Sequence, residues 1–551
     1  MAATTTESHT GRKVALIQPE TLGYTRLYLD FIRGRQTVHE FYPTVSAEQV
    51  AASLDGRDYP RGRLADILAR QNEEFGLSDN TRASIDLLRN ARSVCVFAGQ
   101  QAGLFGGPLF TLIKALAIVK SARLFSERLG RPVVPVFWIA GDDHDFAEAN
   151  HTYVLSRKGE IDKLEYQTRP SFPVPAAEIR FEDSQELTRV INQLAENLGQ
   201  TDFTPALMTS LHRCYTPSDT LVTAFGKFMA ALAGESGLVL FNPCDPEVKR
   251  LAVPFFEQVI NHQEKIGETL SVTSERLRQN GYHVQVEKKK SAVHLFCNQH
   301  GRKAIMRDGD NFAMGDQRVD RSELASLLNE HPEIFSTDVM TRPLLQSSLF
   351  PTLIQIGGPS EIAYFAQVNP LFDLFHIPAP IFRARPTLTL LDRRSEQMMR
   401  EMGIAFEDML GDVEQVVNRV VAATFPADMG RRFASFRIEI ERRFKELAEE
   451  TVSFDSGLQN MAEQTRGKID FLMNGLEAKV FAQHKKKSQE TRERIYRLAN
   501  TLYPQRVLQE RCLNITYFLA RYGAGMVKYI LEHMNSEETA HQLLSLSEYE
   551  P

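Results

Sequence analysis

The sequence predicts an α/β protein built on a mostly parallel sheet with helices on both faces. Two short apolar runs, at 93–98 and 132–139, have the length of strands, and continuous apolar runs are typical of strands buried on both faces. Between them lie a glycine-rich loop and a long helical segment. The order strand, glycine loop, helix, strand defines a βαβ unit, and continued alternation of strands and helices favours a parallel sheet.

The elements around this unit follow the same pattern. Helices are expected at 25–34, at 48–54, after Pro60 and over 109–129, where Gly130 supplies a C-terminal cap. Further strands are expected at 238–242, 352–356 and 379–383. Helical segments separate these strands, as in a doubly wound sheet.

The predicted organisation has three parts. Residues 1–400 form the α/β core with a small β-rich insert at about 270–335, in which 282–307 is expected to form three short strands. Strand patterns then end, and 401–503 are expected to form an antiparallel helical coiled-coil arm. Residues 504–551 return to the core as helices and end in a polar tail.

The arm has the spacing of a coiled coil. Residues 458–502 contain no proline, and their apolar or near-apolar positions mostly recur every three or four residues. These positions are Leu458, Thr465, Ile469, Leu472, Leu476, Val480, Ile495, Leu498 and Leu502. Helices of this length need a partner surface, so the two arms of the hairpin pack together, a second subunit covers them, or both.

Composition excludes several classes of protein. The chain has 551 residues, with 64 Lys and Arg against 70 Asp and Glu, and this slight acidic excess argues against nucleic acid as a partner. Five cysteines form no CxxC pair, which favours a reducing compartment over a disulfide framework or a zinc ribbon. Neither a signal-peptide core nor an apolar run near the ~20 residues of a membrane span is present. We therefore expect a cytoplasmic protein with no membrane partner.

The first candidate segment is the glycine-rich loop between the first strand and its helix. Its candidate binding residues are Gly99, Gln100, Gln101, Gly103 and Gly107. Glycines let a ligand approach the backbone, and the start of the following helix attracts anions. The loop has neither the Gly-Lys-Ser/Thr of a Walker A motif nor GxGxxG spacing. Phosphate or carboxylate binding and a plain tight turn are both open.

The second candidate segment follows the strand that contains Trp138, the only tryptophan of the chain. It carries six ionisable groups: Asp142, Asp143, His144, Asp145, Glu148 and His151. Ligands of open α/β sheets bind beyond the carboxyl ends of strands, and clustered carboxylates and imidazoles suit acid–base chemistry. A helix N-cap needs only one Asp, so a functional cluster is favoured. No HxxxH or HExxH spacing supports a metal site, and none is predicted.

A third segment repeats the order strand, glycine turn, helix. Its candidate binding residues are Arg342, Gln346, Gly357, Gly358, Glu361, Tyr364 and Gln367. Glu361, Tyr364 and Gln367 fall at three-residue spacing, close to one helix face. Glu361 also suits the helix N-terminus, so a cap and a ligand are both open for it. The lysine-serine runs at 288–291 and 485–488 are typical of solvated faces.

Together these segments resemble a known family. The motifs are GQQAGLFGGPLFTLIKA, PVFWIAGDDHDFAEANH and RPLLQSSLFPTLIQIGGPSEIAYFAQ, in this order, followed by LYPQRVLQERCLNITYFLARYG at 502–523. They resemble the bacillithiol biosynthesis cysteine-adding enzymes, the BshC family, over nearly the whole chain. This chain has Asp142, Ser360 and Phe365 where the family tends to have Glu, Gly and Trp.

The resemblance implies a Rossmann-like core related to class I aminoacyl-tRNA synthetases, an inserted domain, and a coiled coil that forms a homodimer. It also implies the last step of bacillithiol synthesis, in which the carboxyl of L-cysteine is joined to the amine of glucosaminyl malate. Our hypothesis from the chemistry is that Asp143, His144 and Asp145 are the catalytic residues, and that Asp143 or His144 holds or deprotonates the amine. The residues of the glycine loop and the third segment, with Trp138, Asp142 and His151, are the predicted substrate-binding residues.

The route of carboxyl activation is open. Activation normally uses ATP, so ATP or another nucleotide is one candidate. The chain has neither His-x-Gly-His nor a convincing KMSKS loop, which argues against adenylylation of the usual synthetase type. A second, nucleotide-type site is predicted from Gln505, Glu510, Arg511 and Asn514. The alternatives are a non-catalytic ligand-binding or scaffold protein with a degenerate synthetase-like core, and a nucleotidyl transferase that acts on another amino acid.

Overall fold

The computed structural model describes residues 14–42, 44–169, 173–299, 301–423 and 427–550. The chain divides into two units. Unit 1 combines Met1–Asp392 with Pro504–Pro551, and unit 2 is Arg393–Tyr503. Every helix within the described ranges is too short or too polar to span a bilayer.

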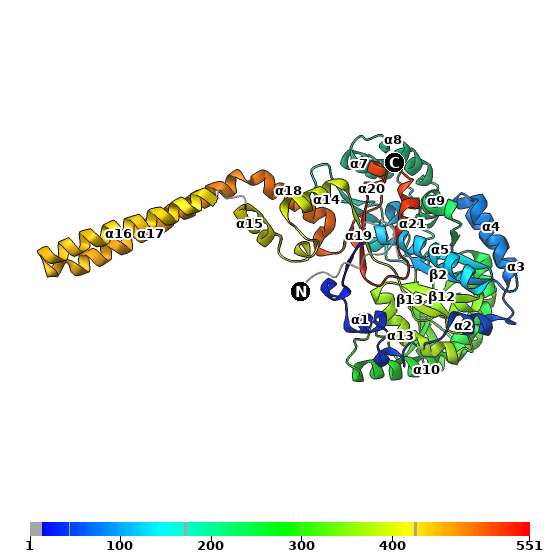
Figure 1. Cartoon of the computed structure of the whole chain (residues 1–551). Helices are drawn as coiled ribbons and strands as arrows, with labels where there is room; N and C mark the ends of the chain where they lie inside the picture. Colours follow the sequence, from blue (N-terminus) through cyan, green and yellow to red (C-terminus); the bar gives the residue numbers. More distant parts are fainter. Residues whose placement is uncertain (1–13, 43, 170–172, 300, 424–426, 551) are drawn as a thin grey trace. The chain divides into compact units, whose positions relative to one another are not determined.

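A five-stranded sheet lies at the centre of unit 1, in the order β13–β12–β2–β3–β6 (Figure 1). Its strands are β2 (Val94–Gln100), β3 (Val133–Ile139), β6 (Val239–Phe241), β12 (Thr352–Gly357) and β13 (Ile381–Ala384). Each neighbouring pair is parallel. The predicted α/β class with a parallel, Rossmann-like sheet is confirmed.

The alternation of side chains along β2 explains why helices cover both faces of the sheet. Val94 and Val96 join one apolar cluster with α5 (Leu109–Leu129), whereas Cys95 and Phe97 join a second cluster with α13 (Pro359–Leu374). Both faces of the strand are therefore buried, which is why its sequence is apolar throughout rather than alternating.

The order of the strands reverses between β2 and β12. From β2 the chain passes through α5 to β3 on one side, while β12 pairs with β2 on the other side. Such a reversal is a topological switch point, where the loops after the two strands diverge and leave a crevice at their carboxyl ends. The glycine loop after β2 and the Gly357–Gly358 turn after β12 flank this crevice.

The remaining helices of unit 1 surround the sheet. They are α1 (Arg26–Ile32), α2 (Ala47–Leu54), α3 (Arg61–Phe75), α4 (Asp79–Leu88), α6 (Phe146–Ala149), α7 (Ser184–Leu198), α8 (Thr204–Cys214), α9 (Leu221–Ala233), α10 (Pro246–Gln279), α11 (Arg321–Glu330), α12 (Arg342–Leu349), α19 (Gln509–Cys512), α20 (Thr516–Tyr522) and α21 (Met526–His533). A separate hairpin pairs β4 (His151–Leu155) with β5 (Ile161–Glu165).

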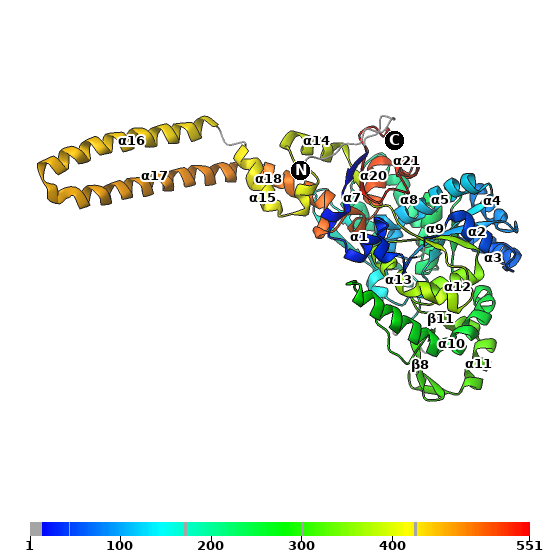
Figure 2. The same ribbon diagram turned by 60° about the horizontal axis from the view of Figure 1, so that its bottom comes forward.

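The insert has more strands than the sequence predicts, and they begin later. Its antiparallel strands are β7 (Ala292–Cys297), β8 (Lys303–Asp308), β9 (Asn311–Met314), β10 (Gln317–Val319) and β11 (Phe335–Thr337), and Figure 2 shows β8 and β11 gathered with α10 and α11. The prediction of a strand at the start of 282–307 is wrong, because the first strand of the insert begins at Ala292. Gln367 instead bonds through its side chain to the backbone N and O of Val286, at 3.0 and 2.9 Å, and these bonds replace strand pairing.

The prediction of a polar C-terminal tail is also wrong for part of its length. β15 (His541–Ser545) is a fully buried strand between β1 (Val14–Ile17) and β14 (Leu388–Leu391). Leu543 and Leu544 carry its apolar contacts. The pattern is only five residues long and both partner strands are distant in sequence, so no local signal marks it.

Across the described residues of unit 2, all regular structure is helical. Its α-helices are α14 (Arg393–Met402), α15 (Val413–Ala423), α16 (Ala427–Phe454), α17 (Gln459–Lys487) and α18 (Gln489–Leu502). Figure 2 shows α16 and α17 running side by side as an antiparallel hairpin, which confirms the predicted helical arm. At its turn, Asp455 Oδ1 accepts a bond of 2.8 Å from Gly457 N.

The predicted coiled-coil positions differ in burial. Ile495, Leu498 and Leu502 in α18 are buried. Leu472 and Leu476 in α17 are 67% and 51% exposed, so packing within the hairpin does not cover them.

His541 in β15 makes the stability of unit 1 dependent on pH. Its Nε2 lies 2.9 Å from Thr389 Oγ1 in β14, and burial lowers its pKa to about 4. Between that value and its ordinary pKa of 6.5, the unfolded chain takes up a proton that the folded chain does not. We therefore expect the free energy of unfolding to fall by on the order of 3 kcal/mol as the pH drops through this range.

The variant His541→Gln should remove this part of the pH dependence. Urea unfolding of the native protein and of the variant, between about pH 7 and pH 4, gives two profiles of unfolding free energy against pH. Their difference measures the contribution of His541, because the contributions of the carboxyl groups, which both proteins share, cancel. Parallel profiles would contradict the assignment to His541.

Candidate functional site

A cavity of about 410 Å³ lies at the switch point, where β2 and β12 end. Residues from all three candidate segments line it. The predicted site residues that line the cavity are Gly99, Gln100, Gln101, Trp138, Arg342, Gly358, Glu361, Tyr364 and Arg511. The lining residues that were not predicted as binding residues are Phe110, Lys114, Ala140, Glu148, Val339, Pro359, Ser360 and Arg385. The structure thus joins the glycine loop, the Trp138 strand and the third segment in one hollow.

Lys114 connects the two strand ends that form the cavity. Its side chain is 2% exposed, and Nζ donates to Gly99 O and Gln100 Oε1, both at 3.0 Å, and to Glu361 Oε2. Three oxygen acceptors match the three N–H groups of an ammonium. Burial lowers the pKa of Lys114, and the Glu361 carboxylate opposes that shift. Glu361 Oε2 also accepts from Gly358 N at 2.7 Å, so Glu361 is both the helix cap and the partner of Lys114.

The cavity carries four cations, of which two have carboxylate partners. Lys114 pairs with Glu361, and Arg385 pairs with the fully buried Glu510 at 2.6 Å. Arg342 bonds to neutral groups instead, Gln346 Oε1 at 3.2 Å and Tyr364 OH at 3.3 Å. Among the described residues, no carboxylate lies within ion-pair distance of Arg342 or Arg511. Glu148 also lines the cavity, so four cations stand against the three carboxylates of Glu148, Glu361 and Glu510, and one positive charge is left for an anionic ligand.

Aromatic groups fix the position of Arg342. Its guanidinium lies 5.6 Å from the centre of the Trp138 ring, a cation–π distance. Burial raises the pKa of Tyr364 to about 12, so its hydroxyl keeps its proton. Because that hydroxyl accepts from Arg342, its own O–H remains a donor for a ligand.

The acid loop, residues 142–145, follows β3, but its side chains do not line the cavity directly. Asp142 Oδ1 accepts from Lys249 Nζ at 2.6 Å and from Cys244 Sγ at 3.3 Å. Burial, together with the nearby Asp142, raises the pKa of the Cys244 thiol well above its ordinary value. This cysteine is therefore no candidate for a thiolate nucleophile.

The three predicted catalytic residues have different surroundings. Asp143 Oδ2 accepts from Gln101 Nε2 at 2.6 Å, which connects it to the cavity by one hydrogen bond. His144 Nδ1 lies 3.1 Å from Arg302 Nη1, and because a guanidinium only donates, the proton of neutral His144 is on Nε2. Asp145 Oδ1 accepts from Glu148 N at 3.1 Å and caps α6, as expected of one Asp in the cluster.

Other predicted residues shape the glycine loop rather than contact a ligand. A Cβ on Gly103 would lie 2.8 Å from Gly107 Cα, so only glycine fits there, and Gly107 has φ 70°. Asn514 is fully buried, and its Nδ2 donates to Phe105 O at 3.0 Å and Gly107 O at 2.7 Å. Asn514 therefore holds the loop in shape and has no surface for a nucleotide.

The remaining predicted residues lie in three kinds of place. Gln346 and Gln367 are buried and bond to Gln355 and Val286. Glu510 is buried against Arg385 and Leu388 N, while Gln505 is exposed with φ 51°. His151 Nδ1 lies 2.8 Å from the backbone oxygen of Ala147. Gly357 is buried, and a side chain at this position would place its Cβ only 2.7 Å from Phe365 Cε2. Of the predicted nucleotide quartet, only Arg511 lines the cavity.

Lys114 is the main residue that motif reasoning missed. The signal is nevertheless present, since it is a lone charge in the apolar stretch LFTLIKALAIV. A lysine in a helix that is buried all round needs partners, which places it near other polar groups.

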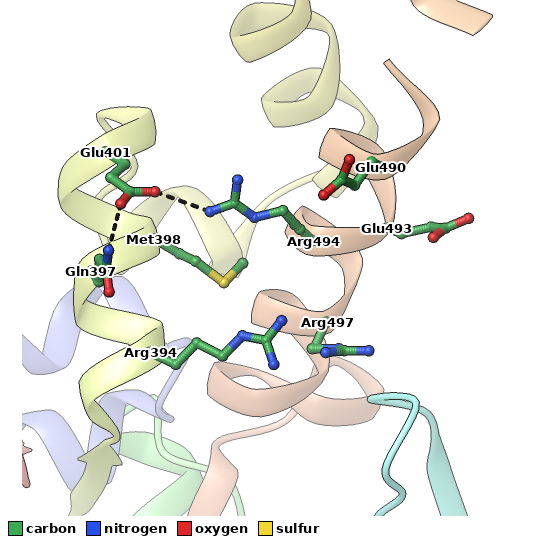
Figure 3. Close-up of a pocket in the computed structure, with 8 residues that line it drawn as sticks. All are labelled: Arg394, Gln397, Met398, Glu401, Glu490, Glu493, Arg494 and Arg497. Atoms are coloured by element: carbon green, nitrogen blue, oxygen red, sulfur yellow. Dashed lines mark hydrogen bonds and ion pairs between the residues drawn. The ribbon is translucent and has the colours of Figure 1, made fainter. Parts of the chain in front are cut away.

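A second hollow, of about 360 Å³, lies within unit 2 between α14 and α18 (Figure 3). Arginines and glutamates line it in equal number: Arg394, Arg494, Arg497, Glu401, Glu490 and Glu493. Figure 3 shows Glu401 bonded to Gln397 and Arg494, at 2.7 and 3.0 Å. Its charges balance one another, so it lacks the excess positive charge of the switch-point cavity.

The fold and the cavity define a Rossmann-like α/β protein with a positively charged cavity at the switch point. Comparison with protein families agrees with this class. The model for "Bacillithiol biosynthesis BshC, N-terminal Rossmann-like domain" matches residues 13–386, and that for "Bacillithiol biosynthesis BshC, C-terminal coiled-coil domain" matches residues 388–546. The chain belongs to the BshC family.

Full-length relatives support this membership. A protein of Salinibacter ruber named "Putative cysteine ligase BshC" is 31% identical over 98% of this chain and 100% of its own length. A protein of the same name from Geobacillus kaustophilus is 31% identical over 94% of this chain and 98% of its own. A solved structure described as "putative arginyl t-RNA synthetase" from Campylobacter jejuni covers 89% of this chain and 99% of that chain at 9% identity, but its TM-score of 0.22 is too low to establish a shared fold.

The Lys249–Asp142 pair behind the acid loop should behave as a buried ion pair. Their side chains are 3% and 15% exposed, and Lys249→Met leaves the Asp142 carboxylate without its charged partner. We expect a loss of about 3 kcal/mol in the free energy of unfolding, measured by urea titration. Adding Asp142→Asn to this variant should restore part of the loss, because the unpaired charge is then removed.

Lys163→Met is the matched control. The Lys163–Glu165 pair has a similar length, 3.0 Å, but its side chains are 41% and 25% exposed. Its loss should stay below about 1 kcal/mol. Equal losses at Lys249 and Lys163 would contradict the assignment of a buried pair.

Proposed function

We propose that this protein joins the carboxyl group of L-cysteine to the free amine of glucosaminyl malate, the last step of bacillithiol synthesis. It is then a ligase that forms a carbon–nitrogen bond. Family membership and the names of the full-length relatives support this reaction. The observation that carries the proposal is the unpaired positive charge in the switch-point cavity.

Glucosaminyl malate is an anion with two carboxylates on its malyl group. Arg342 and Arg511 are the cavity cations without a carboxylate partner among the described residues, and a guanidinium binds a carboxylate through two parallel hydrogen bonds. Trp138 and Tyr364 hold Arg342 in place before the substrate arrives. This arrangement favours the dianionic substrate over a neutral sugar amine.

Amide formation from a carboxylate also needs activation of the carboxyl. ATP or another nucleotide would supply it by taking up the carboxyl oxygen that the amide does not keep. Unpaired guanidinium groups bind phosphate as well as carboxylate, so Arg511, the cavity residue of the predicted nucleotide quartet, fits a nucleotide phosphate.

We propose that the acid loop acts on the amine group of glucosaminyl malate. Asp143 lies behind Gln101, one hydrogen bond from the cavity, and its carboxylate attracts the ammonium group of a substrate in the cavity. His144, with its proton on Nε2, is a donor rather than a base. Asp145 supports both by capping the helix that follows.

Two further properties belong to the same proposal. The coiled-coil arm pairs two copies of the chain, because apolar side chains on α16 and α17 are widely exposed, such as Phe436 at 56%, Phe471 at 77% and Leu472 at 67%. The enzyme acts in the cytoplasm, where its five free cysteines stay reduced.

Thiol analysis in cells tests the reaction. A strain without this gene should lack bacillithiol by mass spectrometry, and the native gene should restore it. Arg342→Gln should reduce the restored level at least about ten-fold, and the pair Asp143→Asn with His144→Ala about a hundred-fold, because both groups that act on the amine are then lost.

Arg318→Gln is the control variant, since this arginine is 73% exposed on the insert and should restore the native level. Full restoration by the Asp143/His144 variant would contradict the role of the acid loop. Normal bacillithiol in the deletion strain would contradict the reaction itself and favour a scaffold.

Light scattering after size exclusion tests the dimer. Leu472→Glu with Leu476→Glu places two charges on the exposed seam, and we expect the mass to fall from that of two chains to that of one. Lys479→Glu on the same helix controls for the added charge. A mass of one chain for the native protein would contradict pairing.

A further inference from the structure

Two adjacent glutamines at the end of β2 are held by partners of opposite charge. Both Gln100 and Gln101 line the switch-point cavity. Gln100 Oε1 lies 3.0 Å from Lys114 Nζ, and Gln101 Nε2 lies 2.6 Å from Asp143 Oδ2. Gln100 therefore bonds to the protein through its amide oxygen, and Gln101 bonds through its amide nitrogen.

The chemistry of the partners fixes both amide orientations. An ammonium only donates, so the oxygen of Gln100 faces Lys114 and its Nε2 is left over. A carboxylate only accepts, so the nitrogen of Gln101 faces Asp143 and its Oε1 is left over. Neither amide can rotate by half a turn without placing like atoms together.

The two atoms left over are open to a ligand. No described residue bonds to Gln100 Nε2 or to Gln101 Oε1, and neither is among the fully buried atoms that lack a partner. One residue thus offers a donor and its neighbour an acceptor, on the same wall of one cavity. A zwitterion, with an anionic acceptor and a cationic donor on one carbon, has the complementary pattern.

We propose that Gln100 and Gln101 form the subsite for the amino-acid substrate. Gln100 Nε2 donates to its carboxylate, and Gln101 Oε1 accepts from its ammonium group. Lys114 and Asp143 are positioning residues in this subsite, because they act through the two glutamines. The inference rests on the proposed function and assigns cysteine to this wall, while Arg342 takes the dicarboxylate.

Two cysteine analogues allow the bond to the carboxylate and the bond to the ammonium group to be tested separately. 3-Mercaptopropionate is cysteine without its amine, and cysteamine is cysteine without its carboxylate. Gln100→Met should raise the dissociation constant of 3-mercaptopropionate about ten-fold and leave that of cysteamine unchanged, whereas Gln101→Met should do the reverse. Both variants should weaken cysteine itself. Titrations of the full-length protein followed by NMR measure all three ligands.

Asp143→Asn tests the positioning role with Gln101 still present. Asparagine offers both a donor and an acceptor, so Gln101 loses its fixed orientation, and cysteamine binding should weaken while 3-mercaptopropionate binding is kept. Gln193→Met, at a surface glutamine that bonds to Arg189, is the matched control and should change nothing.

The outcomes separate this inference from the proposed function. Equal weakening of both analogues by either Gln100→Met or Gln101→Met, or no change in either, overturns the subsite. Unchanged cysteamine binding in Asp143→Asn overturns the orientation argument. A native protein that binds neither cysteine nor its analogues overturns the proposed function itself.

Discussion

The buried ammonium of Lys114 is the constraint on which the site depends. It lies where β2 and β12 end, and its three bonds join a strand carbonyl, the Gln100 side chain and the carboxylate of Glu361. Glu361 in turn accepts from the backbone of Gly358. Without the ammonium, Glu361 would be a half-paired charge in the interior, a loss of about 3–5 kcal/mol. The ammonium of Lys114 thus fixes the distance between the glycine loop after β2 and the Gly357–Gly358 turn after β12.

The pairing of charges explains why this cavity is suited to an anion. Within this cavity, the cations that support the fold have carboxylate partners from the chain, Glu361 for Lys114 and Glu510 for Arg385. Arg342 and Arg511 depart from this rule at the surface of the cavity. A ligand with carboxylate or phosphate groups would pair with these guanidinium groups. In the hollow of unit 2, arginines and glutamates already neutralise one another.

Sequence patterns predicted the parts of this protein that depend on local order. Apolar runs at 93–98 and 132–139 marked the central strands, because strands buried on both faces leave a continuous signal. The roles of polar side chains depend on tertiary partners and were less accessible. Glu510 and Asn514 look like ligands within their motif, yet both are buried and hold Arg385 and the glycine loop. β15 was missed because its partners are far away in the chain.

The insert has a part in the site that its position in the sequence conceals. Two of the cations that hold the acid loop also bond to β11 of the insert: Lys249 Nζ donates to Asp142 and to Phe335 O, and Arg302 bonds to His144 and to Thr337 O. The acid loop is therefore fixed between the end of β3 and an insert strand. A loop of like charges would otherwise spread apart through mutual repulsion. The insert thus helps to hold the two residues that flank Asp143, and Asp143 itself bonds to Gln101 at the cavity.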